Sequence, residues 1–140
     1  MTETTVEGSA RAAGLASQAA VGARDKAAWV ALFAADGIVE DPVGPSGFDP
    51  DGVGHRGHEA IGGFWDKAIA LTDKIEFLFE DSFECGREIA FTGKIRTTMA
   101  GHVIDAEGVF TYKVDADGKI AALRAFWEVD RAMQTTRPVS

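Results

Sequence analysis

The spacing of the hydrophobic residues changes once along this chain, near Asp73. Before that point, apolar residues recur every three or four positions, which is the spacing of one face of an α-helix. After it, apolar and polar residues alternate, which is typical of strands with one buried face. Helices followed by a run of antiparallel strands predict an α+β fold. Helices laid on the concave face of a curved antiparallel sheet would enclose a pocket.

Three helices are expected in the first half of the chain. The first covers residues 9–23, and the second begins after Asp25, which is suited to cap a helix, and ends at Gly37. Residues 38–43 are expected to form a short strand, and residues 44–57 a long loop rich in Gly, Pro and Asp. A third helix follows that loop. The apolar stripes of the second and third helices are Ala28, Trp29, Leu32 and Phe33, and Ile61, Phe64, Trp65, Ala68 and Ile69.

The second half of the chain is expected to form four strands. Two shorter strands come first, and two longer alternating runs follow over residues 102–114 and 119–129. The longer runs are joined by residues 115–118, Asp-Ala-Asp-Gly, which favour a hairpin turn. The alternating apolar residues of the two shorter strands are Ile75, Phe77 and Phe79, and Ile89, Phe91 and Ile95.

The length and charge of the chain limit its organisation and its partners. Its 140 residues predict a single domain over residues 9–140, behind a flexible tail of residues 1–8. A net charge of −8 argues against binding to nucleic acid or to an anionic membrane, since both need a basic face. No apolar run reaches the roughly 18 residues of a membrane span. The lone Cys85 and the polar, acidic N-terminus predict a cytoplasmic protein.

Three motifs that suggest a cofactor or a metal are set aside. Residues 52–57 match a dinucleotide-binding glycine pattern, but a loop precedes them where that motif needs a buried strand. Asp49 and Asp51 supply only part of a calcium loop. His55 and His58 share no fixed face, and a zinc site needs three or four convergent ligands. We therefore expect neither a cofactor nor a metal.

Asp41 stands in the most informative segment, residues 39–44, Val-Glu-Asp-Pro-Val-Gly. One interpretation is a surface turn, because Asp-Pro favours turns. The other is a general base at the mouth of an apolar pocket, where removal of water brings the pKa of a carboxyl towards the working range.

Four segments together resemble the Δ5-3-ketosteroid isomerases, which belong to the superfamily of nuclear transport factor 2-like folds. They are residues 29–44, 57–65, 90–92 and 118–127, and the resemblance spans nearly the whole chain from about Ser9. It implies a curved sheet, three helices around a conical cavity, a homodimer, and a steroid or similar flat hydrophobic ligand. It also implies that Asp41 moves a proton between two steroid carbons without metal or cofactor. These isomerases are the standard example of an Asp base working with an oxyanion hole made by Tyr and a protonated Asp.

The family's oxyanion hole is not matched here. The position of its tyrosine falls on Ser17, and its second acid falls near Gly108. A supporting tyrosine found in some members corresponds to Trp65. Tyr112 is the only tyrosine of the chain and lies on a late strand, so we expect it to replace the missing donor and the activity to be weak.

Strand parity predicts which side chains line the cavity. Alternate residues of a strand share one face. The resemblance implies that one face of residues 108–112 and one face of residues 123–127 point into the cavity. The alternative, favoured for Phe33 and Phe64, is that these side chains pack as ordinary core. The expected lining is Gly108, Phe110 and Tyr112, then Leu123, Ala125 and Trp127, together with Phe33, Phe64, Trp65, Phe91 and Ser17.

Two other functions on the same scaffold remain open. A non-catalytic binding protein would explain the unmatched oxyanion hole. An epoxide hydrolase or a polyketide cyclase is the second, because fold does not determine function. An epoxide hydrolase of the limonene type uses an Asp-Arg-Asp set, for which Arg96, Arg124, Asp105 and Glu107 supply residue types. Asp105 and Glu107 have the opposite parity to Gly108, so they should face away from the cavity.

Apolar residues lie on both faces of the predicted strands. Ile104 and Val109, for example, differ in parity and therefore point to opposite sides of their strand. If the helices cover one face, a second copy of the chain can cover the other, which predicts a homodimer.

Overall fold

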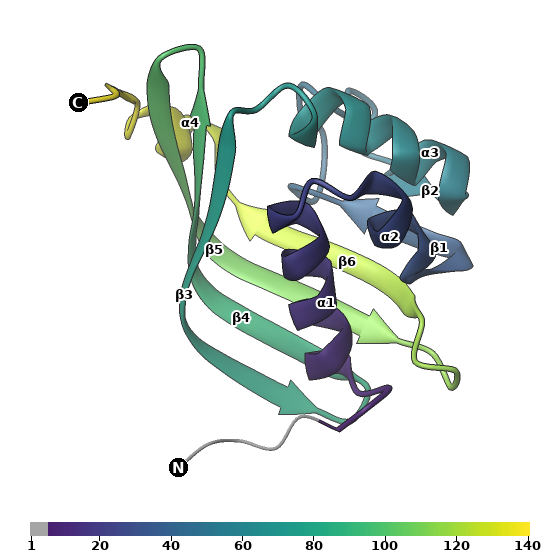
Figure 1. The fold of residues 1–140 in the computed structure, drawn as a ribbon. Coiled ribbons are helices and arrows are strands. Elements are labelled where there is room, and N and C mark those ends of the chain that lie inside the picture. Colours follow the sequence, from purple (N-terminus) through teal and green to yellow (C-terminus); the bar gives the residue numbers. More distant parts are fainter. Residues whose placement is uncertain (1–5) are drawn as a thin grey trace.

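The computed structural model describes residues 6–140, and residues 1–5 of the expected tail lie outside them. Its centre is a seven-stranded sheet with the order β2-β1-β6-β5-β4-β3, and β7 pairs with β5 (Figure 1). All pairs are antiparallel except β1 with β6, which run parallel. The strands are β1 (Phe33–Glu40), β2 (His55–Arg56), β3 (Lys74–Cys85), β4 (Glu88–Met99), β5 (His102–Val114), β6 (Ile120–Trp127) and β7 (Arg137–Pro138).

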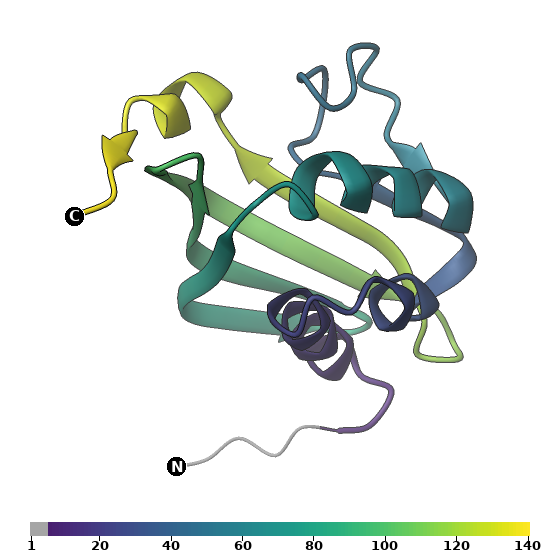
Figure 2. The same cartoon turned by 45° about the horizontal axis from the view of Figure 1, so that its top comes forward.

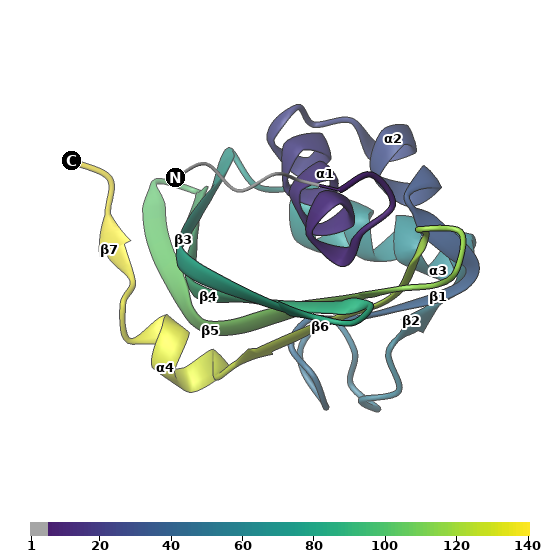
Figure 3. The ribbon, with the colours of Figure 1, turned by 90° about the horizontal axis from the view of Figure 1, so that it is seen from below.

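Helices α1 (Ala10–Gly22), α2 (Lys26–Ala31) and α3 (Gly57–Phe64) cover the concave face of the curved sheet (Figure 3). Side-chain caps stabilise the N-termini of α1 and α2. The Ser9 side chain accepts a hydrogen bond from Ala12 N, and the Asp25 side chain accepts one from Ala28 N. Helix α3 continues into a π-helical turn, η1 (Trp65–Ile69). The predicted α+β fold, its three helices and its curved sheet are confirmed.

Two predicted boundaries are wrong at the second helix and the first strand. The helix ends at Ala31, and the strand runs over Phe33–Glu40 instead of residues 38–43. The cause is a partner distant in sequence: Phe33 pairs with Ile120, and Ile120 N donates to Leu32 O at 2.9 Å. This pairing overrides the helical spacing of the local sequence.

The C-terminal segment also differs from its prediction. The last long strand ends at Trp127, and Val129 begins a short helix, α4 (Val129–Met133), instead of ending the strand. Helix α4 lies on the convex side of the sheet, opposite α1, and β7 then pairs with the start of β5 (Figure 3). The alternating pattern continues to Val129, so the local sequence gave no sign of this turn.

The loop between β1 and β2 extends from the edge of the sheet (Figure 2). The carboxylate of Asp49 accepts hydrogen bonds from Val53 N at 3.3 Å and Gly54 N at 2.7 Å. The ring of Phe48 packs edge-on against Phe64, with 6.0 Å between centroids. The acidic residue that suggested a calcium loop therefore binds backbone amides of its own loop.

One hydrophobic cluster fills the space between the helices and the sheet. Trp29 lies near its centre and is 2% exposed, with its ring 4.9 Å from that of Phe33 and 5.4 Å from that of Trp65. Helix α1 comes close to the sheet at Gly14, where an added Cβ would lie 2.7 Å from Phe91 Cε2. Within residues 6–140, no helix is long and apolar enough to cross a membrane.

Candidate functional site

Asp41 follows directly after β1, and the parallel pairing of β1 with β6 determines its surroundings (Figure 1). Val43 N donates to Ala125 O at 2.9 Å, which holds the segment after Asp41 beside β6. Trp127 ends β6, and its Nε1–H donates to Asp41 Oδ1 at 2.6 Å. This is a short hydrogen bond of the kind that a charged acceptor forms. It ties the predicted base to a predicted lining residue.

The surroundings of Asp41 favour a basic carboxylate. Burial raises the pKa of Asp41 above its ordinary value, and the hydrogen bond from Trp127 opposes that rise without cancelling it. Within the described part of the chain, no lysine or arginine forms an ion pair with Asp41. An aspartate with a raised pKa and a neutral hydrogen-bond donor suits general base catalysis, because its proton affinity is closer to that of the reacting carbon acid.

Tyr112 lies on β5 and is 4% exposed. Burial, the larger cause, and the negative charge of Asp41 raise the pKa of its hydroxyl to about 12, although the neighbouring polar side chains of Ser17 and Gln18 oppose the rise. The hydroxyl is therefore protonated at neutral pH and can donate a hydrogen bond. Because the charge of Asp41 acts on it, the two predicted catalytic groups share one region of the interior.

The remaining predicted lining residues lie in the same interior but pack tightly. The Phe91 ring meets that of Tyr112 edge-on at 5.8 Å, and Phe79 lies 5.3 Å from Phe91 and 5.2 Å from Phe110. Most are less than 8% exposed, and Trp127 is half-buried against the same cluster. These buried lining residues are Trp65, Phe91, Phe110, Leu123 and Ser17.

Gly108 has a structural reason to be glycine. A Cβ built on it would overlap the carbonyl oxygen of Phe126 and lie 3.2 Å from Trp127 Cβ. The neighbouring strand β6 therefore leaves no room for the acidic side chain that the isomerase resemblance places near this position.

Gln18 was missed by the sequence analysis. It lies on α1 beside Ser17, and its Nε2 is buried without a hydrogen-bond partner in the described structure. The signal was available, because residues 14, 17, 18 and 21 share one face of a helix. Phe79, which packs between Phe91 and Phe110, was assigned only to a strand.

The Asp-Arg-Asp residue types do not converge on Asp41. Asp105 lies on the convex side, where it binds Arg96 at 2.8 Å and Arg137 at 3.2 Å. The hydrogen bond from Arg96 is the largest influence on the pKa of Asp105 and lowers it. Arg124 pairs instead with Glu40 at 3.0 Å. Glu107, paired with Arg131 of α4 at 2.6 Å, also faces away from the interior, as its strand parity predicted.

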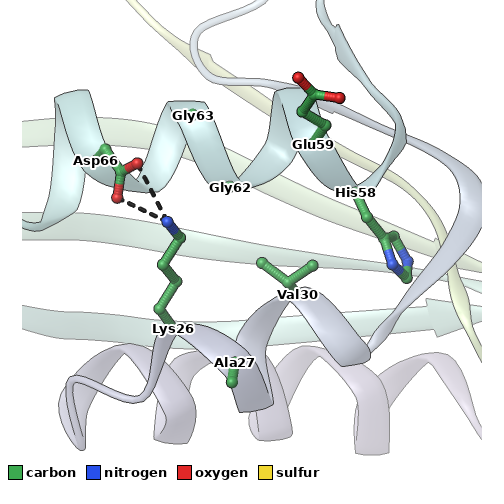
Figure 4. A pocket seen from close by; sticks show the side chains of 8 residues that line it. All are labelled: Lys26, Ala27, Val30, His58, Glu59, Gly62, Gly63 and Asp66. Atoms are coloured by element: carbon green, nitrogen blue, oxygen red, sulfur yellow. Dashed lines mark hydrogen bonds and ion pairs between the residues drawn. The ribbon is translucent and has the colours of Figure 1, made fainter.

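A groove between α2 and α3 lies apart from Asp41 (Figure 4). Lys26 and Asp66 form an ion pair across it at 2.9 Å. Nε2 of His58 lies 2.8 Å from the carbonyl oxygen of Phe33, so this histidine joins α3 to β1. The ring of His55 packs 5.0 Å from that of Phe64. Among residues 6–140, no group of three or more His, Cys, Asp or Glu side chains is arranged to hold a metal ion.

Comparison with known proteins decides the family. The model of the SnoaL-like domain matches residues 15–123. The chain belongs to the SnoaL-like domain family. This SnoaL-like protein is 36% identical over 111 residues to a steroid Delta-isomerase of Nocardioides simplex, and the match covers 77% of this chain and 80% of that protein.

Solved structures agree with this assignment. The chain is similar to the Δ5-3-ketosteroid isomerase from Mycobacterium sp., with a TM-score of 0.82, 35% identity and coverage of 93% of this chain and 98% of that one. It is also similar to RV0760c from Mycobacterium tuberculosis, with a TM-score of 0.84, 34% identity and coverage of 96% and 98%. The structure of RV0760c is also known in complex with estradiol-17β-hemisuccinate. The predicted resemblance to ketosteroid isomerases is confirmed.

Proposed function

We propose that this SnoaL-like protein binds a steroid or a similar flat hydrophobic ligand and transfers an allylic proton, with Asp41 as the general base. The observation that carries the proposal is the Asp41 carboxylate, which is bonded to Trp127 at 2.6 Å and lies beside an aromatic interior. Among the described residues no lysine or arginine forms an ion pair with Asp41, so its charge is not taken up by a salt bridge and is available for proton transfer. The steroid Delta-isomerase relative and the estradiol-derivative complex of RV0760c support the choice of ligand.

The reaction is a proton transfer that returns the base to its starting state. In a Δ5-3-ketosteroid, Asp41 removes a proton from C4, and the electron pair moves into a dienolate with its negative charge on the C3 oxygen. The protonated Asp41 then delivers the proton to C6, which gives the conjugated Δ4-3-ketone. The raised pKa of Asp41 assists the first step, and the polar partner of the C3 oxygen must stabilise the dienolate.

Tyr112 is the proposed partner of that oxygen. Its hydroxyl keeps its proton at neutral pH, lies in the apolar interior, and feels the charge of Asp41. We expect turnover to be weak, because a missing donor to a developing oxyanion typically costs about 10²- to 10³-fold and no acid can occupy the position of Gly108.

The assay is the appearance of the conjugated ketone from 5-androstene-3,17-dione, measured together with the affinity for a steroid. Tyr112→Phe removes the hydroxyl and keeps the ring, so we expect roughly 10²-fold slower turnover and nearly unchanged affinity for an apolar steroid. A Tyr112→Phe variant as fast as the wild type would remove Tyr112 from the site. A wild type that binds no steroid would refute the proposed function.

A non-catalytic binding protein is the second candidate. The observation in its favour is Gly108, whose surroundings exclude the second acid of the isomerases. It predicts tight steroid binding with no turnover above the buffer rate. An epoxide hydrolase is disfavoured, since Arg96 and Asp105 pair on the convex side, away from Asp41.

We propose further that the protein is a homodimer that pairs through the convex face of the sheet. The strand registers place Val109 beside Phe126, and these side chains are 38% and 43% exposed. Phe83 is 59% exposed on β3. Sedimentation at micromolar concentration should show a species of twice 14.9 kDa, and a sample that contains only the single-chain mass would contradict this proposal.

A cytoplasmic location is proposed on the exposed thiol of Cys85, which a reducing compartment would keep free.

A further inference from the structure

The position of the Trp127 indole depends on the end of β6. Trp127 is the last residue of that strand and pairs with Gly108 of β5. On the other side of β6, the pairing with β1 stops earlier, at Arg124 opposite Glu40. The ends of such elements fray unless the chain that follows them is held in place. The residues after Trp127 therefore determine how firmly its indole is held against Asp41.

Residues 128–139, here called the C-terminal strap, cross to the convex side of the sheet and return to β5 (Figure 3). The hydroxyl of Thr135 accepts a hydrogen bond from Asp105 N at 2.7 Å and donates one to Ala132 O at 2.7 Å. This hydroxyl thus bonds β5 through its oxygen and the end of α4 through its proton. The pairing of β7 with the start of β5 adds backbone contacts to the same link.

The carboxylate of Asp105 forms a second link between β5 and the strap. Its Oδ2 accepts a hydrogen bond from Arg137 of β7 at 3.2 Å, and its Oδ1 accepts one from Arg96 of β4 at 2.8 Å. The ammonium group of Lys94 lies 3.8 Å from the same carboxylate. Asp105 is only 8% exposed, and a carboxylate is rarely so buried without partners of this kind. It lies on the convex side, so it does not contact a ligand in the interior.

We propose that Asp105 is a positioning residue of the proton-transfer site, although it lies on the opposite side of the sheet. Its bonds to the C-terminal strap hold the end of β6 in place, and that end carries the indole of Trp127 to Asp41. This inference rests on the proposed function and adds a residue that acts through Trp127. A loosened strap would let the end of β6 fray, which would lengthen or break the 2.6 Å bond. The ionised form of Asp41 would then lose a strong donor.

Two substitutions in the strap test this inference without changing Asp105 itself. Thr135→Val keeps the shape of the side chain and removes the hydroxyl that accepts from Asp105 N. Arg137→Met keeps an unbranched stem and removes the guanidinium that binds the carboxylate. Both leave that carboxylate paired with β4, so we expect the variants to fold, which thermal unfolding checks. Thr136→Val is the matched control, because it removes a neighbouring hydroxyl that donates instead to Met133 O at 2.6 Å.

The indole N–H groups report directly on the bond to Asp41. The chain has three tryptophans, so a spectrum of nitrogen-15-labelled protein gives three indole signals, and Trp127→Phe identifies the one from Trp127. A short hydrogen bond to a carboxylate moves an indole proton to low field. We expect the double variant Thr135→Val/Arg137→Met to move the Trp127 proton to higher field and to leave the other two signals in place. Thr136→Val should leave all three unchanged.

The pH dependence of kcat/KM for 5-androstene-3,17-dione connects this bond to function. The double variant of the strap should move the acid limb to higher pH, in the same direction as Trp127→Phe, because both changes weaken the same bond. Added to Trp127→Phe, the strap substitutions should cause no further shift, since the bond on which they act is already absent. A purely structural role of the strap would lower the melting temperature and leave the acid limb where it is.

A folded double variant with the Trp127 signal and the acid limb of the wild type would overturn this inference alone. So would a Thr136→Val control that shifts both as far as the double variant does. A wild type that binds steroid without turnover would refute the proposed catalysis instead, and the Trp127 signal would still show whether the strap positions the indole.

Discussion

Replacing Trp127 by Phe removes one hydrogen bond from Asp41 and keeps an aromatic ring at that position. The lost bond joins Nε1 to Oδ1 at 2.6 Å and involves an ionised acceptor. Hydrogen bonds to charged groups contribute about 1.5–3 kcal/mol, so the ionised form of Asp41 loses roughly 10- to 100-fold in relative population. The bond from Trp127 lowers the pKa of Asp41, and its removal must therefore raise that pKa further.

The consequence is visible in the pH dependence of kcat/KM. The general base acts in its ionised form, so the acid limb of the profile should move to higher pH in Trp127→Phe. Trp65→Phe is the matched control, because it trims a buried indole of the same cluster that forms no hydrogen bond with Asp41. An acid limb at the same pH in wild type and in a folded Trp127→Phe variant would refute this description of the site.

Two further substitutions test other parts of the structure. Gly108→Asp should not restore the missing acid: its side chain would collide with the Phe126 carbonyl, and we expect about 1–3 kcal/mol lower stability in urea unfolding and no gain in turnover. A stable, faster Gly108→Asp variant would contradict the crowding that the structure shows at Gly108. Asp105→Asn should lower the melting temperature at neutral pH, because the pKa of Asp105 is lowered by Arg96 and its ionised form stabilises the fold. That contribution is present above the unfolded pKa, near 3.8, and is lost as the pH falls through the lower folded value, so the two melting temperatures should converge in acid.

The order of the elements was predictable because it depends on local spacing. The change from helical to alternating periodicity near Asp73 separates α1, α2 and α3 from β3, β4, β5 and β6. Ser9 was the first residue of the predicted helix, and Asp25 was predicted as a cap from its residue type; both cap helices. Such features need only a few neighbouring residues, so one sequence contains them.

Features that depend on distant partners were not predictable. Phe33 continues a helical stripe in sequence, yet it lies in β1 because Ile120 pairs with it. The bond between Asp41 and Trp127 joins residues 86 positions apart, and nothing in either segment specifies the other. Helix α4 forms after an alternating run that reads as strand up to Val129.

The residues of the candidate site also differ in how far the sequence alone could identify them. Asp41 stood out because its segment resembles that of the isomerases, whereas the unpartnered amide nitrogen of Gln18 is visible only in the folded interior. Ser17 was expected to face the ligand, and the structure shows its oxygen already accepting from Trp29. Hydrogen-bond direction is a property of the folded interior, and a linear pattern does not contain it.

The most direct test of the central claim is the turnover of 5-androstene-3,17-dione by Asp41→Asn beside the wild type, with steroid affinity measured on both. The amide has nearly the shape of the carboxylate but cannot accept the proton, so we expect about 10²- to 10⁴-fold slower isomerisation and affinity within a few-fold of the wild type. Burial raises the pKa of Asp41, so its ionised form destabilises the fold above the unfolded pKa; Asp41→Asn should therefore melt at a higher temperature at neutral pH. Wild-type isomerisation that persists unchanged in Asp41→Asn would contradict the assignment of Asp41 as the base.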